Sequence, residues 1–170
     1  MACRRDPWVR ENLRKEAAAR GANPARLVFA PKIPCAEHLA RQSLADLFLD
    51  TWPYNAGTTA SDALWVGLPV LTCAGGSFAS RMEGSLLHAV GLPELVTHST
   101  EAYEALAIDL AESPKRLQTL RERLIENRRT APLFSTDRFT RNLEAAFAHM
   151  WERHCRGEMP ESFAPAINST

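Results

Sequence analysis

Residues 46–73 read DLFLDTWPYNAGTTASDALWVGLPVLTC, and this stretch predicts the fold. A short apolar segment over residues 46–50 runs into a polar loop, and a helical segment follows over residues 58–66. The sequence Gly-Leu-Pro at residues 67–69 ends the helix, and residues 70–73 form a second apolar segment. Two short buried strands joined by a helix are typical of a right-handed βαβ unit in a parallel sheet.

The same alternation continues upstream of this stretch. Asp6-Pro7 predicts the start of a helix that ends near Gly21, because Asp is a common capping residue and Pro suits the first turn. Residues 27–29 (Leu-Val-Phe) predict a short buried strand, and residues 36–43 predict a short helix.

Downstream, a glycine-rich turn leads into a helix predicted from Phe78 to about Val90. Leu95-Val96 predicts a last, very short strand. The expected fold class is therefore α/β, with a Rossmann-like parallel sheet and flanking helices over residues 1–98.

The remainder predicts a helical C-terminal segment. We expect three helices, with caps at Ser99, at Ser113 and at Ser135 or Thr136. The last helix carries an apolar stripe made of Phe139, Leu143, Phe147, Met150 and Trp151. Its spacing predicts core packing, with the alternative that part of it is exposed as a docking face or an aggregation liability. We expect one lobe over residues 1–156 and a frayed tail over residues 157–170.

The amino-acid composition favours a soluble globular protein over a membrane or nucleic-acid-binding protein. The chain has 170 residues, of which 45% are apolar, and its 20 basic and 20 acidic residues balance, which suits one globular domain. A balanced chain does not favour charge-driven binding to nucleic acid or membranes. No segment has the apolar core of a secretory signal or the roughly 18 apolar residues of a membrane span.

The cysteines point to a reducing compartment. Cys3, Cys35, Cys73 and Cys155 are scattered and form no CxxC pair, so the sequence predicts four reduced thiols and no metal site. We therefore expect a cytoplasmic protein.

A candidate anion site follows the strand predicted over residues 46–50, because parallel α/β sheets bind ligands at the carboxyl ends of their strands. The helix start at Gly57-Thr58-Thr59 offers free N–H groups and the positive end of the helix dipole. Gly57 lets a phosphate approach the backbone, and the two threonines add hydroxyl donors. Asp62, one turn later, can accept hydrogen bonds from a ribose diol. The pattern suits a nucleoside diphosphate, although Thr and Asp are also ordinary capping residues.

Other polar residues carry weaker signals. Gly75-Gly76-Ser77 either lines the same pocket or is an ordinary tight turn. Arg81 either neutralises phosphate or is an ordinary helix charge. The segment 121–129, with arginines between glutamates, predicts a salt-bridged surface helix. We assign no role to a set of residues that have no partner at ligand or triad spacing: Glu83, His88, His98, His149 and His154.

Residues 46–87, DLFLDTWPYNAGTTASDALWVGLPVLTCAGGSFASRMEGSLL, resemble the C-terminal catalytic lobe of O-GlcNAc transferases and their bacterial and SPINDLY-type relatives. The similarity extends upstream through LRKEAAARG and LVFAPKIPCAEHLARQSLADL, and downstream through PLFSTDRFTRNLEAAFAHMW. It covers roughly residues 8–155. The resemblance implies the partial C-terminal lobe of a GT-B glycosyltransferase, a fold of two Rossmann-like halves with a cleft between them.

The resemblance also implies roles for particular residues. Thr58 and Thr59 would contact the diphosphate of a UDP-sugar, and Asp62 would contact the ribose. His38 and Arg41 would lie by the uracil and the adjoining pocket wall. The sequence departs from the family at two positions: Gly57 stands where members often have His, and Cys35 stands where the animal enzymes have a ribose-contacting Lys.

By the same resemblance, the chain would be the UDP-sugar-binding lobe of a protein O-linked N-acetylglucosaminyltransferase. Such an enzyme transfers GlcNAc from UDP-GlcNAc to Ser or Thr of proteins by an inverting mechanism, for which no metal or cofactor is expected. The implied partners are UDP-GlcNAc or a related UDP-sugar, a protein acceptor, the N-terminal lobe and tetratricopeptide repeats. The last two are family segments that lie outside this chain, and no catalytic residue is assigned.

Two alternatives remain open at this point. The chain could be a non-catalytic nucleotide-binding or interaction fragment that keeps the fold without turnover. It could also belong to another GT-B family, such as a UDP-sugar epimerase or a glycan synthase, for which we would expect a C-terminal glutamate-rich nucleotide motif.

Overall fold

A computed structural model describes residues 7–163 of the chain. The chain divides into two compact units, Met1–Arg41 and Gln42–Thr170. We call them the N-terminal unit and the sheet unit and describe each by itself.

The N-terminal unit contains helices and loops. Helix α1 spans Pro7–Ala19, as expected, and Gly21 follows with a positive φ of 78°. The short helix η2 spans Pro24–Arg26, and α2 spans Cys35–Gln42, within one residue of its predicted bounds. The first residue of the predicted cap, Asp6, lies outside the described residues.

The strand predicted over residues 27–29 is wrong. Residues 27–34 adopt no helix or strand, and Val28 is 87% exposed. The described residues of the N-terminal unit include no strand with which this segment could pair. The centroid of the Phe29 ring instead lies 5.6 Å and 5.3 Å from the guanidinium carbons of Arg10 and Arg14, so the ring packs against cations on α1.

The sheet unit is built on three short parallel strands. These are β1 (Phe48–Leu49), β2 (Val70–Cys73) and β3 (Val96–Thr97), in the spatial order β1-β2-β3. Phe48 pairs with Val70, and Thr72 pairs with Val96. The prediction of a parallel α/β sheet is confirmed, although β1 is shorter than expected and β3 begins one residue late. The delay arises because Leu95 ends the short helix η3 (Pro93–Leu95).

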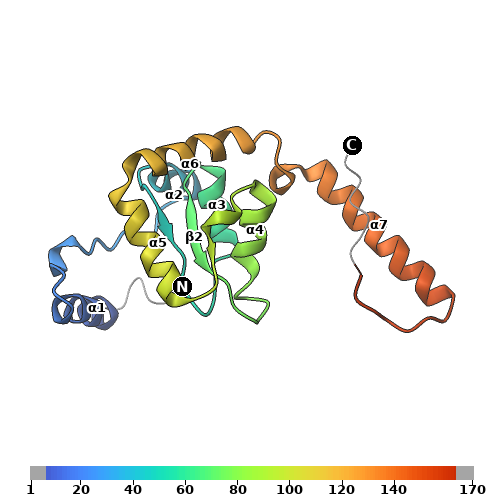
Figure 1. The fold of residues 1–170 in the computed structure, drawn as a ribbon, viewed down its shortest axis with the longest axis horizontal. Helices are drawn as coiled ribbons and strands as arrows, with labels where there is room; N and C mark the ends of the chain where they lie inside the picture. Colours follow the sequence, from blue (N-terminus) through green and yellow to red (C-terminus); the bar gives the residue numbers. More distant parts are fainter. Residues whose placement is uncertain (1–6, 164–170) are drawn as a thin grey trace. The chain divides into compact units, whose positions relative to one another are not determined.

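Helices connect and cover these strands. Helix α3 (Thr58–Trp65) joins β1 to β2, and α4 (Met82–Val90) joins β2 to β3. In Figure 1, α3 and α4 lie on one side of β2 and α5 (Thr100–Glu112) lies on the other, the layering of a doubly covered parallel sheet. Helix α4 begins four residues later than predicted, because Ser77 and Ser80 hydrogen-bond one another in a tight turn before it.

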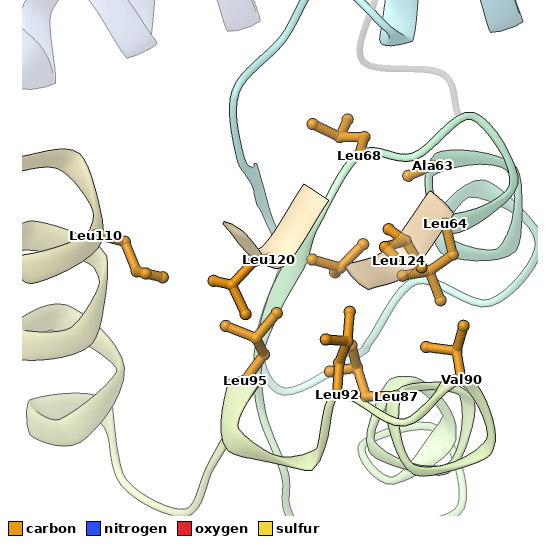
Figure 2. Packing of buried hydrophobic residues seen from close by; sticks show 11 residues of the cluster. Ala63, Leu64, Leu68, Leu87, Val90, Leu92, Leu95, Leu110, Leu120 and Leu124 are labelled. Carbon is orange, nitrogen blue, oxygen red and sulfur yellow. The ribbon is translucent and has the colours of Figure 1, made fainter. Parts of the chain in front are cut away.

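The hydrophobic core lies around β2, whose four residues are all buried. Figure 2 shows leucine, valine and alanine side chains from α3, α4, η3, α5 and α6 (Pro114–Asn127) converging on the strand. Leu64, Leu87, Leu110 and Leu124 are completely buried and come from four different helices. The core therefore ties together segments that lie far apart in the sequence.

Side chains of α6 and of its C-cap residue Arg128 hydrogen-bond to backbone carbonyls at the ends of α3 and α4. Arg128 Nη1 donates to the carbonyl of Trp65 at 2.8 Å, and Arg121 Nε donates to that of Gly67 at 3.3 Å, just past the end of α3. Asn127 Nδ2 donates to Val90 at the end of α4 at 2.8 Å. The expected salt bridges within α6 are replaced by these contacts and by an ion pair between Arg123 and Glu94. Cationic donors suit the negative ends of helix dipoles.

The last helix, α7, spans Thr136–Cys155 and is capped by Ser135, which accepts from Arg138 N at 3.4 Å. Its apolar stripe does not form core packing, which corrects the sequence-based expectation. Phe139 is 64% exposed, and Leu143, Phe147, Met150 and Trp151 are also exposed. Helical spacing predicts an apolar face correctly but does not determine what covers it. Of the predicted tail, residues 157–163 carry no helix or strand, and residues 164–170 lie outside the described residues.

Leu64→Ala is expected to lower the free energy of unfolding by about 2–5 kcal/mol, because it opens a cavity beside β2. Leu44→Ala makes the same chemical change at a side chain that is 81% exposed, and it is expected to change stability by less than about 0.5 kcal/mol. Urea denaturation of the chain and both variants measures the difference. Equal losses for the two variants would contradict this placement of the core.

Candidate functional site

The candidate site lies at the carboxyl ends of β1 and β2. The chain leaves β1 at Leu49 and crosses a loop over residues 50–57 before α3, and it leaves β2 at Cys73 before the turn that precedes α4. Both loops emerge at one edge because the strands are parallel neighbours. This is the edge at which open α/β sheets bind ligands.

Asp50 organises the loop that leads into α3. Its side chain is almost fully buried, and Oδ1 accepts hydrogen bonds from the backbone N–H of Thr51 and Ala56, both at 2.8 Å. Oδ2 accepts from the Thr72 hydroxyl on β2 at 2.7 Å. One carboxylate thus bends the loop back on itself and fastens it to the neighbouring strand. Bonds from neutral donors to a carboxylate are stronger than neutral pairs.

Tyr103 and Asn55 reinforce this loop. The Tyr103 hydroxyl on α5 donates to the Asp50 carbonyl at 2.8 Å, and burial, with the Asp50 charge, raises the pKa of Tyr103 so that the donor is retained. Asn55 Nδ2 donates to Thr51 at 3.0 Å and to Cys73 at 3.4 Å. Its Oδ1 is buried and has no hydrogen-bond partner.

Helix α3 begins directly after this loop, and its first turn is open. The first intrahelical bond runs from Ser61 N to the Gly57 carbonyl at 2.9 Å. Within the described residues, the N–H groups of Gly57, Thr58, Thr59 and Ala60 have no recorded hydrogen-bond acceptor, as expected for a helix start. Gly57 at the cap position supplies no side-chain oxygen to satisfy them. An anion placed here would meet several donors and the positive end of the helix dipole.

The predicted residues on α3 share this end of the helix. Thr58 and Thr59 are exposed, whereas Gly57 and Asp62 are partly buried. A methyl group at Gly57 would lie 3.6 Å from Met82 Cγ, an ordinary contact, so this glycine is not required by packing. The structure therefore brings together four of the six predicted site residues.

The other two predicted residues lie on α2 and contact one another. Arg41 Nη2 lies 3.1 Å from His38 Nδ1, and Arg41 Nη1 donates to the Pro31 carbonyl at 3.0 Å. Because a guanidinium can only donate, His38 Nδ1 is the acceptor and the imidazole proton resides on Nε2.

The glycine-rich turn after β2 is a tight turn, which agrees with one of the two interpretations of its sequence. Gly75 N donates to the Ser80 carbonyl at 2.9 Å. A methyl group at Gly75 would lie 2.7 Å from Ser80 Oγ, so packing in the turn requires a glycine there. Ser80 Oγ also accepts from Ser77 N at 3.0 Å, which closes the turn before α4.

Glu83 is a feature that the sequence analysis did not interpret. It lies in the first turn of α4 with no exposed surface, and both carboxyl oxygens are buried without a hydrogen-bond partner. Burial, and secondarily the charge of Asp50, raise its pKa to about 8. At neutral pH the group is therefore mostly protonated. The sequence around Glu83 does not indicate this burial, because a single glutamate in a helix is usually exposed.

Exposed aromatic side chains near the strand ends were also missed. Trp52 and Tyr54 in the loop after β1, and Phe78 in the turn after β2, are all exposed. The Trp52 indole nitrogen lies 3.7 Å from the place a methyl group on Gly75 would occupy, so the two loops are in contact. Aromatic residues beside prolines and glycines in predicted strand-end loops were the available signal.

Residues 7–163 contain neither a metal centre nor a membrane-spanning helix. No group of three or more His, Cys, Asp or Glu side chains in this range is arranged to hold a metal ion. No helix in the same range is long and apolar enough to span a membrane. Cys35, Cys73 and Cys155 are free thiols, and Cys3 lies outside the described residues.

Comparison with known proteins identifies relatives over most of the chain. A family model described as Glycosyl transferase family 41 matches residues 4–143. A probable UDP-N-acetylglucosamine–peptide N-acetylglucosaminyltransferase of Arabidopsis thaliana, SEC, is 40% identical over 151 residues. The UDP-N-acetylglucosamine–peptide N-acetylglucosaminyltransferase of Caenorhabditis elegans is 35% identical over 147 residues.

A solved structure supports the same relationship. A variant of the Thermobaculum terrenum O-GlcNAc transferase superposes with a TM-score of 0.83 and 35% identity, over 91% of this chain and 30% of that one. This similarity confirms the expected fold class, part of the C-terminal lobe of a GT-B protein. The chain spans only 16% and 13% of the Arabidopsis and Caenorhabditis proteins, although 88% and 86% of this chain is aligned.

Asp50→Ala is expected to lower the free energy of unfolding by about 2–4 kcal/mol, because it leaves buried N–H and hydroxyl donors without their acceptor. Asp46→Ala removes an exposed carboxylate two residues before β1 and serves as the matched control. Urea denaturation measures both variants. If both lose the same small amount of stability, Asp50 does not hold the loop.

Glu83→Gln tests the buried carboxyl through its pH dependence. The pKa of Glu83 is raised from 4.5 to about 8 in the folded state, so between these pH values the native state keeps the carboxyl proton that the unfolded state has lost. The wild type therefore loses stability as pH rises from 4.5 to about 8. The advantage of the variant over the wild type should therefore grow between these pH values, by up to about 1.4 kcal/mol per pH unit.

Chemical denaturation at several pH values measures this advantage. Glu112→Gln, on α5, controls for the loss of one exposed carboxylate. A difference between the wild type and Glu83→Gln that is constant from acidic to alkaline pH would show that Glu83 ionises normally.

Proposed function

Because the chain belongs to glycosyl transferase family 41, we propose that its sheet unit binds the diphosphate and ribose of a UDP-sugar donor, UDP-GlcNAc or a close relative. The observation that carries the proposal is the open start of α3. Gly57, Thr58, Thr59 and Ala60 present N–H groups without acceptors at the carboxyl edge of the sheet.

Different groups at this helix start contact different parts of the UDP-sugar. The backbone donors and the hydroxyls of Thr58 and Thr59 contact the diphosphate, and the Asp62 carboxylate accepts from the ribose hydroxyls. Asp50 is the positioning residue, because its hydrogen bonds to Ala56 and Thr72 fix the direction in which the helix begins. Gly57 leaves room at the helix start, with no side chain between phosphate and backbone.

The pair on α2 supplies the recognition of the base in this proposal. The family resemblance places His38 by the uracil, and the hydrogen bond from Arg41 Nη2 to its Nδ1 fixes the orientation of the imidazole ring. Trp52 and Tyr54 offer exposed aromatic surface for the sugar. The role of His38 follows the family resemblance, and that of Trp52 and Tyr54 follows their exposure in the loop after β1.

In the intact enzyme, the helix start would stabilise the negative charge that develops on departing UDP during transfer of GlcNAc to Ser or Thr. The hydroxyl of the protein acceptor and the residues that handle its proton would be brought by the N-terminal lobe and the tetratricopeptide repeats, in a longer parent chain or in trans. The proposal includes no metal or cofactor and places the protein in the cytoplasm.

Calorimetric titration of UDP, UDP-GlcNAc and uridine into the chain tests this proposal. UDP should bind more tightly than uridine, because uridine lacks the anion. Thr58→Ala/Thr59→Ala/Asp62→Ala should weaken UDP binding by roughly tenfold or more, which corresponds to about 1.4 kcal/mol. His38→Ala should weaken UDP and uridine alike, since it alters base recognition.

A triple variant of the same composition on α5 and α6, Thr100→Ala/Thr119→Ala/Asp109→Ala, serves as the control because all three positions are exposed. It should bind UDP as the wild type does. A folded chain that binds no UDP, or equal binding by both triple variants, would reject the donor site and favour a non-catalytic interaction module.

A further inference from the structure

An open groove of about 710 Å³ lies between α4, β3, the short helix η4 (Pro132–Phe134) and the first turns of α7. Its apolar floor includes Ala74, Ala89, Val96 and Pro132. None of the proposed donor-binding residues lines it. The groove is therefore a separate feature of the sheet unit, and a ligand bound in it would not depend on the proposed donor site.

The groove is rimmed by basic side chains. Arg81 at the start of α4, His88 further along it, His98 after β3 and Arg138 on α7 all line it. No ion pair within the described residues involves any of these four, and no carboxylate lines the groove. The chain carries no net charge, so this local excess of positive charge is a property of the fold.

Arg138 brings an unsatisfied donor and a positive charge to the groove. Its Nε is buried, and this donor has no hydrogen-bond partner. Arg123 and Arg153 also bury an Nε without a partner, but their guanidinium groups form ion pairs with Glu94 and Glu161. Among residues 7–163, Arg138 forms no such ion pair. A buried guanidinium donor without an acceptor is costly, and a carboxylate is the group that best matches its geometry.

The histidine on α4 is held in one orientation. His88 Nδ1 lies 2.7 Å from the Gly84 carbonyl, and because a carbonyl only accepts, this nitrogen carries the proton. The contact between Gly84 and His88 holds the imidazole ring against its own helix.

We propose that this groove binds an acidic segment of a partner polypeptide, with carboxylates on Arg81 and Arg138 and an apolar side chain over the floor. The charge of the rim and the apolar floor fit glutamate or aspartate interspersed with aliphatic residues. A concave groove fits an extended chain better than a flat bilayer surface. Its lining contains no Phe, Tyr or Trp on which nucleotide bases would stack.

Fluorescence anisotropy with a short fluorescein-labelled peptide of glutamate and leucine tests the assignment. The wild-type chain should bind this probe, with affinity that falls as salt rises. Arg81→Glu/Arg138→Glu should weaken binding by roughly tenfold or more. Lys115→Glu/Arg129→Glu makes the same change in net charge at two exposed positions outside the groove and should leave binding nearly unchanged.

Two further variants test the groove independently of the double variant. Arg81→Glu alone changes an exposed side chain, so it keeps the test available if the double variant does not fold. Ala89→Trp fills the groove floor without changing charge and should also weaken binding. Equal losses in the two double variants, or no effect of Ala89→Trp, would show diffuse attraction and overturn the proposal. A single-stranded DNA probe that binds more tightly than the peptide and is lost in the same variants would overturn the choice of partner.

Discussion

The hydrogen bonds of one buried carboxylate, that of Asp50, set the geometry on which the rest of the site depends. The carboxylate ends β1, fastens it to Thr72 on β2 and turns the following loop so that α3 begins at the carboxyl edge of the sheet. Tyr103 from α5 holds the same residue through its carbonyl. Without these contacts the strand, which has only two residues, would give the loop no fixed direction. A short sheet thus acquires a rigid edge through side-chain acceptors.

This arrangement has an energetic cost nearby. Glu83 and Asn55 bury oxygen atoms that lack partners, and the charge of Asp50 disfavours ionisation of Glu83. Buried unsatisfied groups are uncommon in native cores, so the oxygens of Glu83 and Asn55 reduce stability. The core around β2, with leucines from four helices, offsets this cost by hydrophobic burial.

The two proposed sites share a physical basis but not their residues. At the start of α3, the attraction for an anion comes from backbone dipoles and free N–H groups, so it requires little side-chain charge. In the groove beside α4 and α7, it comes from the guanidinium groups of Arg81 and Arg138, neither of which forms an ion pair within residues 7–163. A chain with balanced formal charge can therefore present positive potential at two places, because balance over the sequence does not imply balance over each surface.

The sequence by itself determined the local elements and the family. Capping residues such as Ser99 and Ser135, the helix over Thr58–Trp65 and the strand over Val70–Cys73 were predictable, because caps, turns and apolar periodicity act within a few residues. Tertiary structure decided the rest. Residues 27–29 had the composition of a strand but no neighbour to pair with, and the apolar stripe of α7 had the spacing of a core face but remained exposed. The burial of Glu83 and the missing partner of Arg138 likewise depend on which distant segments pack together, and local sequence does not specify that choice.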